Sequence, residues 1–228
     1  GLSIKALCGI LIDVYFTIVN NETRVRLLMK GKTAYFLYDR HEPYFYLDAP
    51  ASDIPKLMKA SALHRGEKIT PARMEEVEME VEGKRRKILK VYAKHPPQVP
   101  DLRSAFHDLR AFEYNIPFGR RYMIDRQLSP LSKLKYERLG KRLVRVLKKG
   151  ECAPKFRMMS FDIETYNPLG APRPEKDPAI MISYATGKTL EQAHVLTYKE
   201  AEGAHWAKNC HDEKGMIEEF CRMLKNED

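Results

Sequence analysis

Apolar positions in the first part of the chain follow the period of β-strands, interrupted by short polar clusters. Residues 7–19 and 25–29 are rich in β-branched and aromatic side chains, and the cluster at 20–23 between them reads Asn-Asn-Glu-Thr. Two such runs on either side of a turn cluster predict a hairpin. The same pattern predicts two more strands at 34–38 and 44–47 and then a helix at 53–63.

A second hairpin is predicted from alternating charge. Glutamates occupy every second position from 76 to 82, Gly83 turns the chain, and residues 85–92 are rich in Lys and Arg. Opposite charges that face each other across antiparallel strands stabilise a hairpin. We interpret these glutamates as a solvated face and not as a chemical site.

Prolines at 96, 97 and 100 mark a loop, after which the pattern predicts helices at 101–109 and 121–127 with an aromatic stretch at 112–118 between them. This order of sheet, helix, sheet, helix and strand predicts an α+β fold. We therefore expect a small mixed-sheet amino-terminal domain at residues 1–130.

Residues 131–154 form a basic segment that we interpret as a linker or a hairpin insert. Between residues 133 and 149 there are eight Lys or Arg and one acid, Glu137, which accounts for most of the net charge of +9. Gly140 at its centre favours a hairpin, although the spacing of its leucines also suits a helix face. Lys141, Arg142 and Arg145 are candidate phosphate contacts, and a merely solvated surface is the alternative interpretation.

From residue 155 the pattern predicts the opening of a mixed α/β sheet. Strands are expected near 156–165, 179–185 and 193–198, followed by a helix at 212–224. The first strand carries Asp162 and Glu164 two positions apart, so both carboxylates are expected on one face. Two neighbouring carboxylates repel each other unless a cation lies between them, which makes this pair a candidate metal site.

The totals narrow the classes of function. The chain has 228 residues, 43% of them hydrophobic, and a pI near 9.3, a balance suited to a polyanionic partner such as nucleic acid. No stretch reaches the roughly 18 to 20 consecutive apolar residues of a membrane span, and the start lacks the order of a signal peptide. We therefore expect a cytoplasmic protein with no membrane partner.

Four segments together resemble archaeal family B DNA polymerases. They are 42–46 (EPYFY), 95–103 (HPPQVPDLR), 112–125 (FEYNIPFGRRYMID) and 161–165 (FDIET), the last followed by 180–185 (IMISYA). The resemblance covers the whole chain in the order of that family. It implies an amino-terminal domain followed, at residues 155–228, by the first strands of a ribonuclease H-like 3′-5′ exonuclease domain.

The resemblance also implies the chemistry of the acid pair. Asp162 would be the shared ligand and Glu164 the second ligand of a two-metal nuclease that uses Mg²⁺ or Mn²⁺. The family completes this site, and the polymerising site, with residues that we expect beyond residue 228. We therefore expect an inactive fragment that binds metal weakly and is located at the nucleoid. The expected partners are single-stranded or primer-template DNA and the rest of the polymerase. Through that missing part, we also expect contact with a sliding clamp.

A second site implied by the resemblance is a pocket that recognises uracil in the template strand. Apolar and aromatic walls stack a flipped base and exclude water, and backbone groups read its edge. The matching positions are Tyr15, Pro43, Tyr44, Val99, Ile116, Pro117, Phe118 and Arg121. Arg121 could instead hold a phosphate or an acid of the same domain.

Two further interpretations remain open at this point. The chain could be a stand-alone binder of single-stranded DNA or RNA, for which an outward aromatic pair, Tyr44 with Tyr46 or Phe36 with Tyr38, would be the discriminating feature. It could also be a subunit that completes a split polymerase by association with a separate chain.

Overall fold

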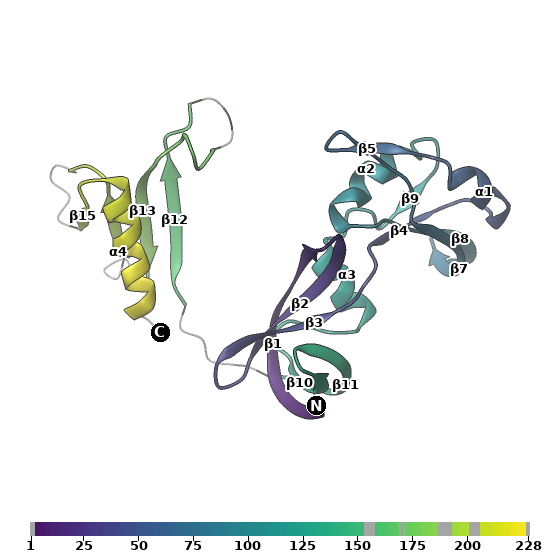
Figure 1. Ribbon diagram of the computed structural model, residues 1–228, viewed down its shortest axis with the longest axis horizontal. Coiled ribbons are helices and arrows are strands. Elements are labelled where there is room, and N and C mark those ends of the chain that lie inside the picture. The colour runs from purple at the N-terminus through teal and green to yellow at the C-terminus, as the bar shows by residue number, and fades with distance from the viewer. Residues whose placement is uncertain are drawn as a thin grey trace. The chain divides into compact units, whose positions relative to one another are not determined.

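The computed structural model describes residues 3–152, 158–168, 170, 172–186, 193–200 and 206–226. It divides into two compact units, Gly1–Pro154 and Lys155–Asp228, which are described separately. Strands outnumber helices in both (Figure 1), and the predicted α+β class is confirmed. No helix of the described part is long and apolar enough to cross a membrane.

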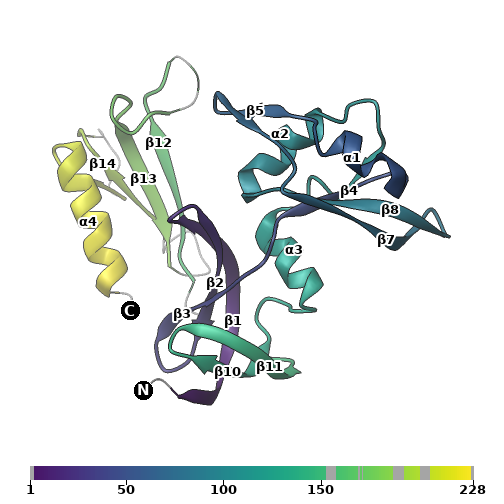
Figure 2. The same cartoon turned by 45° about the vertical axis from the view of Figure 1, so that its right-hand side comes forward.

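A closed five-stranded barrel, built from the two ends of the segment, forms one half of unit 1 (Figures 1 and 2). Its strands are β1 (Ile4–Val19), β2 (Glu22–Lys30), β3 (Ala34–Asp39), β10 (Lys133–Leu139) and β11 (Arg142–Gly150). Around the barrel they follow the order β1-β10-β11-β3-β2. All neighbours are antiparallel except β11 and β3, which meet in parallel where Arg142 pairs with Tyr38.

Alternate residues of the barrel strands are apolar and point inward, where they form the core of the barrel. On β2, Val25, Leu27 and Met29 are fully buried, which is the period of two that a sheet with one buried face requires. The turn from β1 to β2 places Asn20 and Asn21 at positive φ, the conformation of a tight hairpin turn. The predicted hairpin is confirmed.

A second sheet, in the order β7-β8-β4-β9, forms the other half of unit 1. Its strands are β7 (Arg73–Val81), β8 (Lys84–Tyr92), β4 (Tyr44–Leu47) and β9 (Ala111–Phe112). The charged hairpin forms as predicted, with Lys87 paired to Glu76 at 3.0 Å. The core of this half contains Phe45, Leu89 and Leu102.

Short helices and a small hairpin cover this sheet. They are η1 (Ala51–Asp53), α1 (Ile54–Leu57), β5 (Ala62–His64), β6 (Glu67–Ile69), η2 (Pro96–Gln98) and α2 (Val99–Ser104). The predicted helix at 53–63 is wrong beyond Leu57, because residues 62–64 pair with 67–69 instead. The predicted helix at 101–109 ends at Ser104 and starts two residues early.

Helix α3 (Phe118–Asp125) lies between the barrel and the second sheet (Figures 1 and 2). Its first turn approaches β1 so closely that a Cβ atom on Gly119 would lie 2.3 Å from the carbonyl oxygen of Val14. Only glycine fits this approach without movement of the backbone. The contact fixes the start of α3 against the barrel wall.

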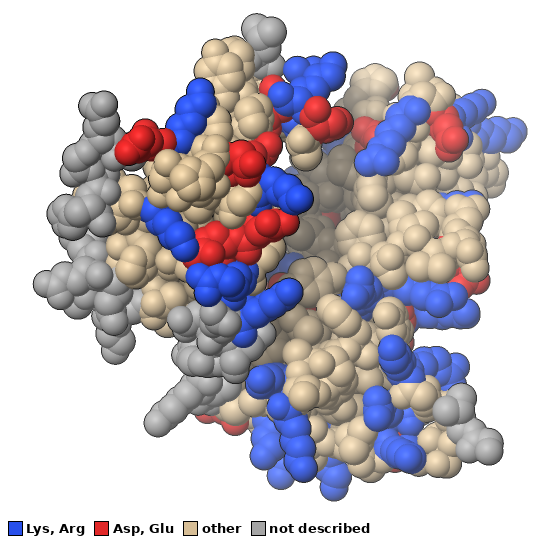
Figure 3. Space-filling view, turned by 60° about the vertical axis from the view of Figure 1, so that its left-hand side comes forward, with Lys and Arg blue, Asp and Glu red and all other residues tan. Residues whose placement is uncertain are grey.

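The basic segment belongs to the barrel and is not a linker. Residues 133–139 and 142–150 form β10 and β11, so the hairpin interpretation is confirmed and the helix interpretation is wrong. The compact unit consequently extends to Pro154 instead of ending at 130, because the barrel cannot close without these strands. Lys and Arg side chains gather over the barrel surface in Figure 3, with few acids among them.

Unit 2 is a sheet with one helix packed on it. Its strands are β12 (Ser160–Thr165), β13 (Ala179–Ala185), β14 (Ala193–Thr197) and β15 (Ala207–Asn209), in that order, and its helix is α4 (Glu213–Asn226). Ile182, Leu196, Met216 and Phe220 form the core between the sheet and α4. The predicted helix and the strands at 179–185 and 193–198 are confirmed. The first predicted strand is confirmed from Ser160, and its start at 156–157 lies outside the described residues. Strand β15, which pairs in parallel with β14, was not predicted. The expected turn at 187–188 lies outside the described residues.

Candidate functional site

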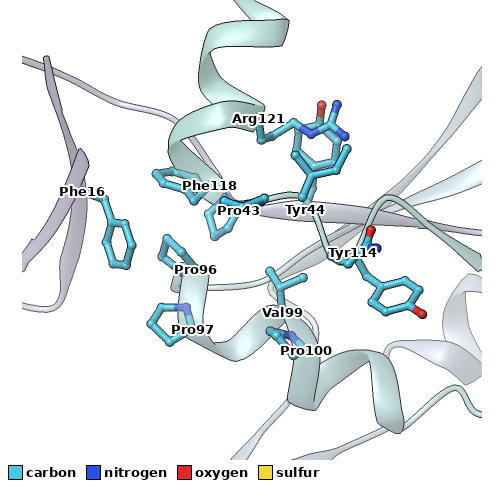
Figure 4. Close-up of a pocket in the computed structure, with 13 residues that line it drawn as sticks. Phe16, Pro43, Tyr44, Pro96, Pro97, Val99, Pro100, Tyr114, Phe118 and Arg121 are labelled. Carbon is cyan, nitrogen blue, oxygen red and sulfur yellow. The ribbon is translucent and has the colours of Figure 1, made fainter. Parts of the chain in front are cut away.

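A pocket of about 310 Å³ opens within unit 1 between the barrel and the helices of the second half (Figure 4). Pro43 and Phe118 lie on one side of it and Pro96 and Val99 on the other. Its volume is at the lower end of the range for small-molecule sites. It is lined by Phe16, Pro43, Tyr44, Pro96, Pro97, Val99, Pro100, Tyr114, Asn115, Ile116, Pro117, Phe118 and Arg121.

Seven of the eight residues matched to the uracil pocket line this cavity, and Tyr15 does not. Neighbouring residues of a strand point to opposite faces, so Phe16 takes the place of Tyr15 in the wall. Phe16 meets the ring of Phe118 edge to face at 5.6 Å. The prolines of η2, Pro96 and Pro97, also line the wall. The sequence pattern did not predict this role, although both lie in the segment 95–103 that carries the family resemblance.

The hairpin that carries Phe16 is held in place by His95. The Nδ1 atom of His95 lies 2.9 Å from the hydroxyl of Thr23, and its Nε2 atom lies 2.8 Å from the side-chain oxygen of Asn21. Both ring nitrogens therefore have hydrogen-bond partners, and burial of the ring lowers the pKa of His95, which favours the neutral form. This link ties the tip of the barrel hairpin to the start of η2.

Arg121 is a buried side chain held by acids of its own domain. Its guanidinium donates to Glu113 and lies 3.5 Å from Asp125, and only 7% of the side chain is exposed. Its charged carbon lies 5.1 Å from the centre of the Tyr44 ring. Arg121 was expected to hold either a phosphate or an acid of the same domain if it does not serve the pocket, and the structure shows contacts with two acids. Its Nε atom is buried without a hydrogen-bond partner among the described residues.

Tyr44 is fixed by the same group of side chains. Its hydroxyl donates to both carboxylate oxygens of Asp125, at 2.8 and 2.7 Å, and burial together with this bond raises the pKa of Tyr44. Its ring lies 5.4 Å from that of Tyr46, and Lys90 covers it at 3.7 Å. Tyr44 and Tyr46 are thus packed side chains and not a free stacking surface.

The three candidate phosphate contacts lie at one end of the barrel. Lys141 and Arg142 are exposed at the turn between β10 and β11. Arg145 is also exposed, but it donates to Glu137 at 2.8 Å. A phosphate at Arg145 would have to compete with that carboxylate, so Lys141 and Arg142 are the better placed of the three.

Asp162 and Glu164 lie exposed on β12, the edge strand of the sheet in unit 2. Phe161 packs on Phe220 of α4 at 5.3 Å, so the alternation of the strand directs the two carboxylates to the face opposite α4. Within the described ranges no group of three or more potential metal ligands comes together. The two acids supply hard oxygen ligands of the kind that Mg²⁺ and Mn²⁺ prefer, but on their own they form only part of a coordination shell.

Comparisons with known proteins agree with this arrangement. A family model described as DNA polymerase family B, exonuclease domain, matches residues 109–228. DNA polymerases of Thermococcus sp. (strain GE8) and Archaeoglobus fulgidus are 34% and 32% identical over 84% and 96% of this chain. The structure of the family B DNA polymerase from Pyrobaculum calidifontis matches 96% of the chain with a TM-score of 0.63 and 27% identity.

The chain spans only part of these relatives. It covers 10% of the Thermococcus protein, 27% of the Archaeoglobus protein and 29% of the Pyrobaculum chain. The family model nevertheless matches more than half of the chain, and the relatives match it almost throughout. The resemblance read from the sequence is confirmed: this chain belongs to DNA polymerase family B.

Proposed function

We propose that the chain is the template-binding part of a DNA-directed DNA polymerase and that its pocket recognises uracil in single-stranded DNA. The observation that carries the proposal is the pocket of unit 1, whose wall contains seven of the eight residues expected for this role. Its relatives bear the name DNA polymerase. Polymerisation, and contact with a sliding clamp, would reside in parts of the relatives that this chain does not span.

The chemistry of the wall supports a flat, uncharged ligand. Proline, valine and phenylalanine side chains exclude water from both faces of a base and offer surfaces for stacking. Pro117, the N-cap of α3, makes no side-chain hydrogen bond to the helix, and the first N–H groups of a helix have no partner within the helix. We expect these groups to act as donors at the pocket wall. The carbonyl oxygens of uracil are acceptors that suit these donors.

Discrimination against thymine would rest on Val99. Its side chain is 8% exposed and forms part of the wall. A methyl group in a filled apolar pocket changes affinity by about 10- to 200-fold. We therefore expect a fluorescence titration to show tighter binding of a single strand that contains one uracil than of the same strand with thymine. Equal affinity for the two strands would refute the proposal.

We further propose that Asp162 and Glu164 are part of a 3′-5′ exonuclease site. They would hold Mg²⁺ or Mn²⁺, which in such sites supplies charge stabilisation at the phosphate and a more acidic water. Because two exposed carboxylates alone bind such ions weakly, we expect negligible degradation of a labelled primer by this chain. Magnesium-dependent, processive degradation that Asp162→Ala abolishes would contradict this expectation.

A further inference from the structure

The order of strands in the barrel points to a surface outside the pocket. Counted along the chain, the first strand of the barrel neighbours the second and the fourth, and the fifth closes in parallel onto the third. This is the Greek-key order of OB-type barrels, which bind oligonucleotides on the face of their second and third strands, between the loops 1–2 and 4–5. Here these elements are β2, β3 and the turns at 20–21 and 140–141.

The outer side of β2 and β3 carries aromatic and basic side chains. Val25 and Leu27 of β2 and Leu37 of β3 are buried in the barrel, so the residues between them point outward. The antiparallel register sets Arg26 opposite Tyr38 and Leu28 opposite Phe36. We call this surface the β2–β3 face and define it by Arg24, Arg26, Leu28, Phe36 and Tyr38.

Arg26 is arranged for stacking. Its guanidinium carbon lies 4.0 Å above the centre of the Phe36 ring, and both side chains are half-buried. A planar cation on an aromatic ring offers a flat surface to a base and donors to a phosphate. The arrangement therefore serves both parts of a nucleotide.

The turn at 140–141 brings more positive charge to the end of this face. The N–H of Tyr38 donates to the carbonyl of Lys141 at 2.8 Å, and Arg142 is paired with Tyr38. Both basic side chains are exposed. The acid nearest to Arg24 is Glu22 at 3.6 Å, with both side chains about half exposed, and such surface pairs contribute little free energy. The face therefore stays strongly basic.

We propose that the β2–β3 face is a second binding site for single-stranded DNA, separate from the pocket. The backbone contacts Arg24, Lys141 and Arg142, and bases stack on Phe36 with Arg26 and on Tyr38. Stacking of this kind accepts every base, so the site binds without regard to sequence. It differs in this respect from the proposed uracil pocket. An oligothymidylate, which that pocket should bind at least about tenfold more weakly than a uracil strand, therefore reports mainly on the face.

The electrostatic test is the salt dependence of binding to a fluorescent oligothymidylate of about 12 nucleotides, a length within the range for one OB barrel. The double variant Arg24→Ala/Arg142→Ala removes two phosphate contacts. Each contact adds about 0.7 to the slope of log affinity against log salt, so the slope should fall by about 1.4. The matched control, Lys56→Ala/Lys59→Ala, removes equal charge from two exposed positions, one in α1 and one just after it. The salt slope of this control should equal that of the unchanged chain. Equal slopes for the two double variants would overturn the proposal.

The stacking test uses Phe36. Phe36→Leu should weaken oligothymidylate binding at least about fivefold, whereas Phe36→Tyr, which keeps the ring, should not. A blunt duplex, whose bases cannot stack, should lose no affinity through Phe36→Leu. Equal losses for duplex and single strand would overturn the stacking site. If Phe36→Leu unfolds the barrel, as circular dichroism would report, the salt slopes still decide.

These variants also separate the two proposals. Phe36→Leu should weaken a thymine-containing strand at least as much as a uracil-containing one, because the face does not read the base, so the ratio of uracil to thymine affinity should not fall below that of the unchanged chain. A missing uracil preference would remove the pocket proposal and leave the face intact. An unchanged oligothymidylate affinity in Phe36→Leu would remove the proposal for the β2–β3 face and leave the pocket proposal intact.

Discussion

Replacing Arg121 with methionine tests whether the acids around the pocket depend on one buried cation. The substitution keeps most of the volume of the side chain and removes its charge. Glu113 loses a donor and Asp125 loses a neighbour at 3.5 Å, while Tyr44 loses the guanidinium 5.1 Å from its ring. The result should be a less stable unit 1 with a loosened pocket wall.

The magnitude follows from the burial of the partners. Removing one member of a fully buried ion pair costs about 3 to 5 kcal/mol. The Glu113 and Asp125 side chains are 31% and 25% exposed, and Asp125 keeps the hydrogen bond from Tyr44, so we expect about 2 kcal/mol. At about 2 to 4 °C per kcal/mol, the midpoint of thermal unfolding should fall by about 4 to 8 °C.

The assay is thermal unfolding followed by circular dichroism, with Arg120→Ala as the matched control. Arg120 is the preceding residue on α3 and its side chain is exposed, so its loss should change stability by less than about 0.5 kcal/mol. A double-mutant cycle with Glu113→Gln should give a coupling free energy of at least about 0.5 kcal/mol. Equal shifts for Arg121→Met and Arg120→Ala would refute the reasoning.

Two other predictions concern the supports of the pocket. Gly119→Ala places a Cβ atom 2.3 Å from the Val14 carbonyl oxygen and should lower the free energy of unfolding in urea by about 1 to 3 kcal/mol. Gly150→Ala, where the nearest atom is 3.9 Å away, should be nearly neutral. Similar losses of stability in the two variants would contradict the close approach. Burial lowers the pKa of His95, with Lys94 and His64 adding to the effect, so the folded state disfavours the protonated ring. The stability that depends on neutral His95 should therefore be fully present above about pH 6.5 and be lost as the pH drops through the lowered pKa. His95→Gln should flatten that part of the profile of unfolding midpoint against pH. An unchanged profile in His95→Gln would show that His95 does not cause it.

Local hairpins could be predicted from the sequence because their signals are local. Alternation with a period of two, a turn cluster and facing charges define the β1–β2 and β7–β8 hairpins without knowledge of the rest of the chain. The helix predicted at 53–63 was wrong beyond Leu57 because another local signal, a turn, competes with the helical pattern. Its apolar spacing suited a helix, but a turn at Arg65 and Gly66, both at positive φ, folds residues 62–64 back as a strand.

The closure of the barrel could not be predicted. The contact between β3 and β11 joins residues about a hundred positions apart in parallel, and no periodicity specifies which distant strand will be the partner. The domain boundary expected at residue 130 excludes β10 and β11 because nothing in the local sequence indicates that these strands pair with β1 and β3. The position of Tyr15 shows a finer limit: a shift of one residue along a strand exchanges the two faces, and Phe16 lines the pocket instead.

The acid pair shows what sequence can and cannot establish. The spacing of Asp162 and Glu164 on a strand correctly implied a shared face, because alternation is a property of the strand itself. Whether other ligands join them depends on chain segments that pack from elsewhere. The described residues bring no third ligand to the pair.

The most direct test of the central claim is to measure dissociation constants for two single strands that differ only in one uracil or thymine, in the unchanged chain and in Val99→Ala. The unchanged chain should prefer the uracil strand by at least about tenfold. Val99→Ala should reduce this preference mainly by improving thymine binding, because the smaller side chain makes room for the methyl group. Equal affinity for both strands in the unchanged chain, or a preference that Val99→Ala leaves untouched, would contradict the account.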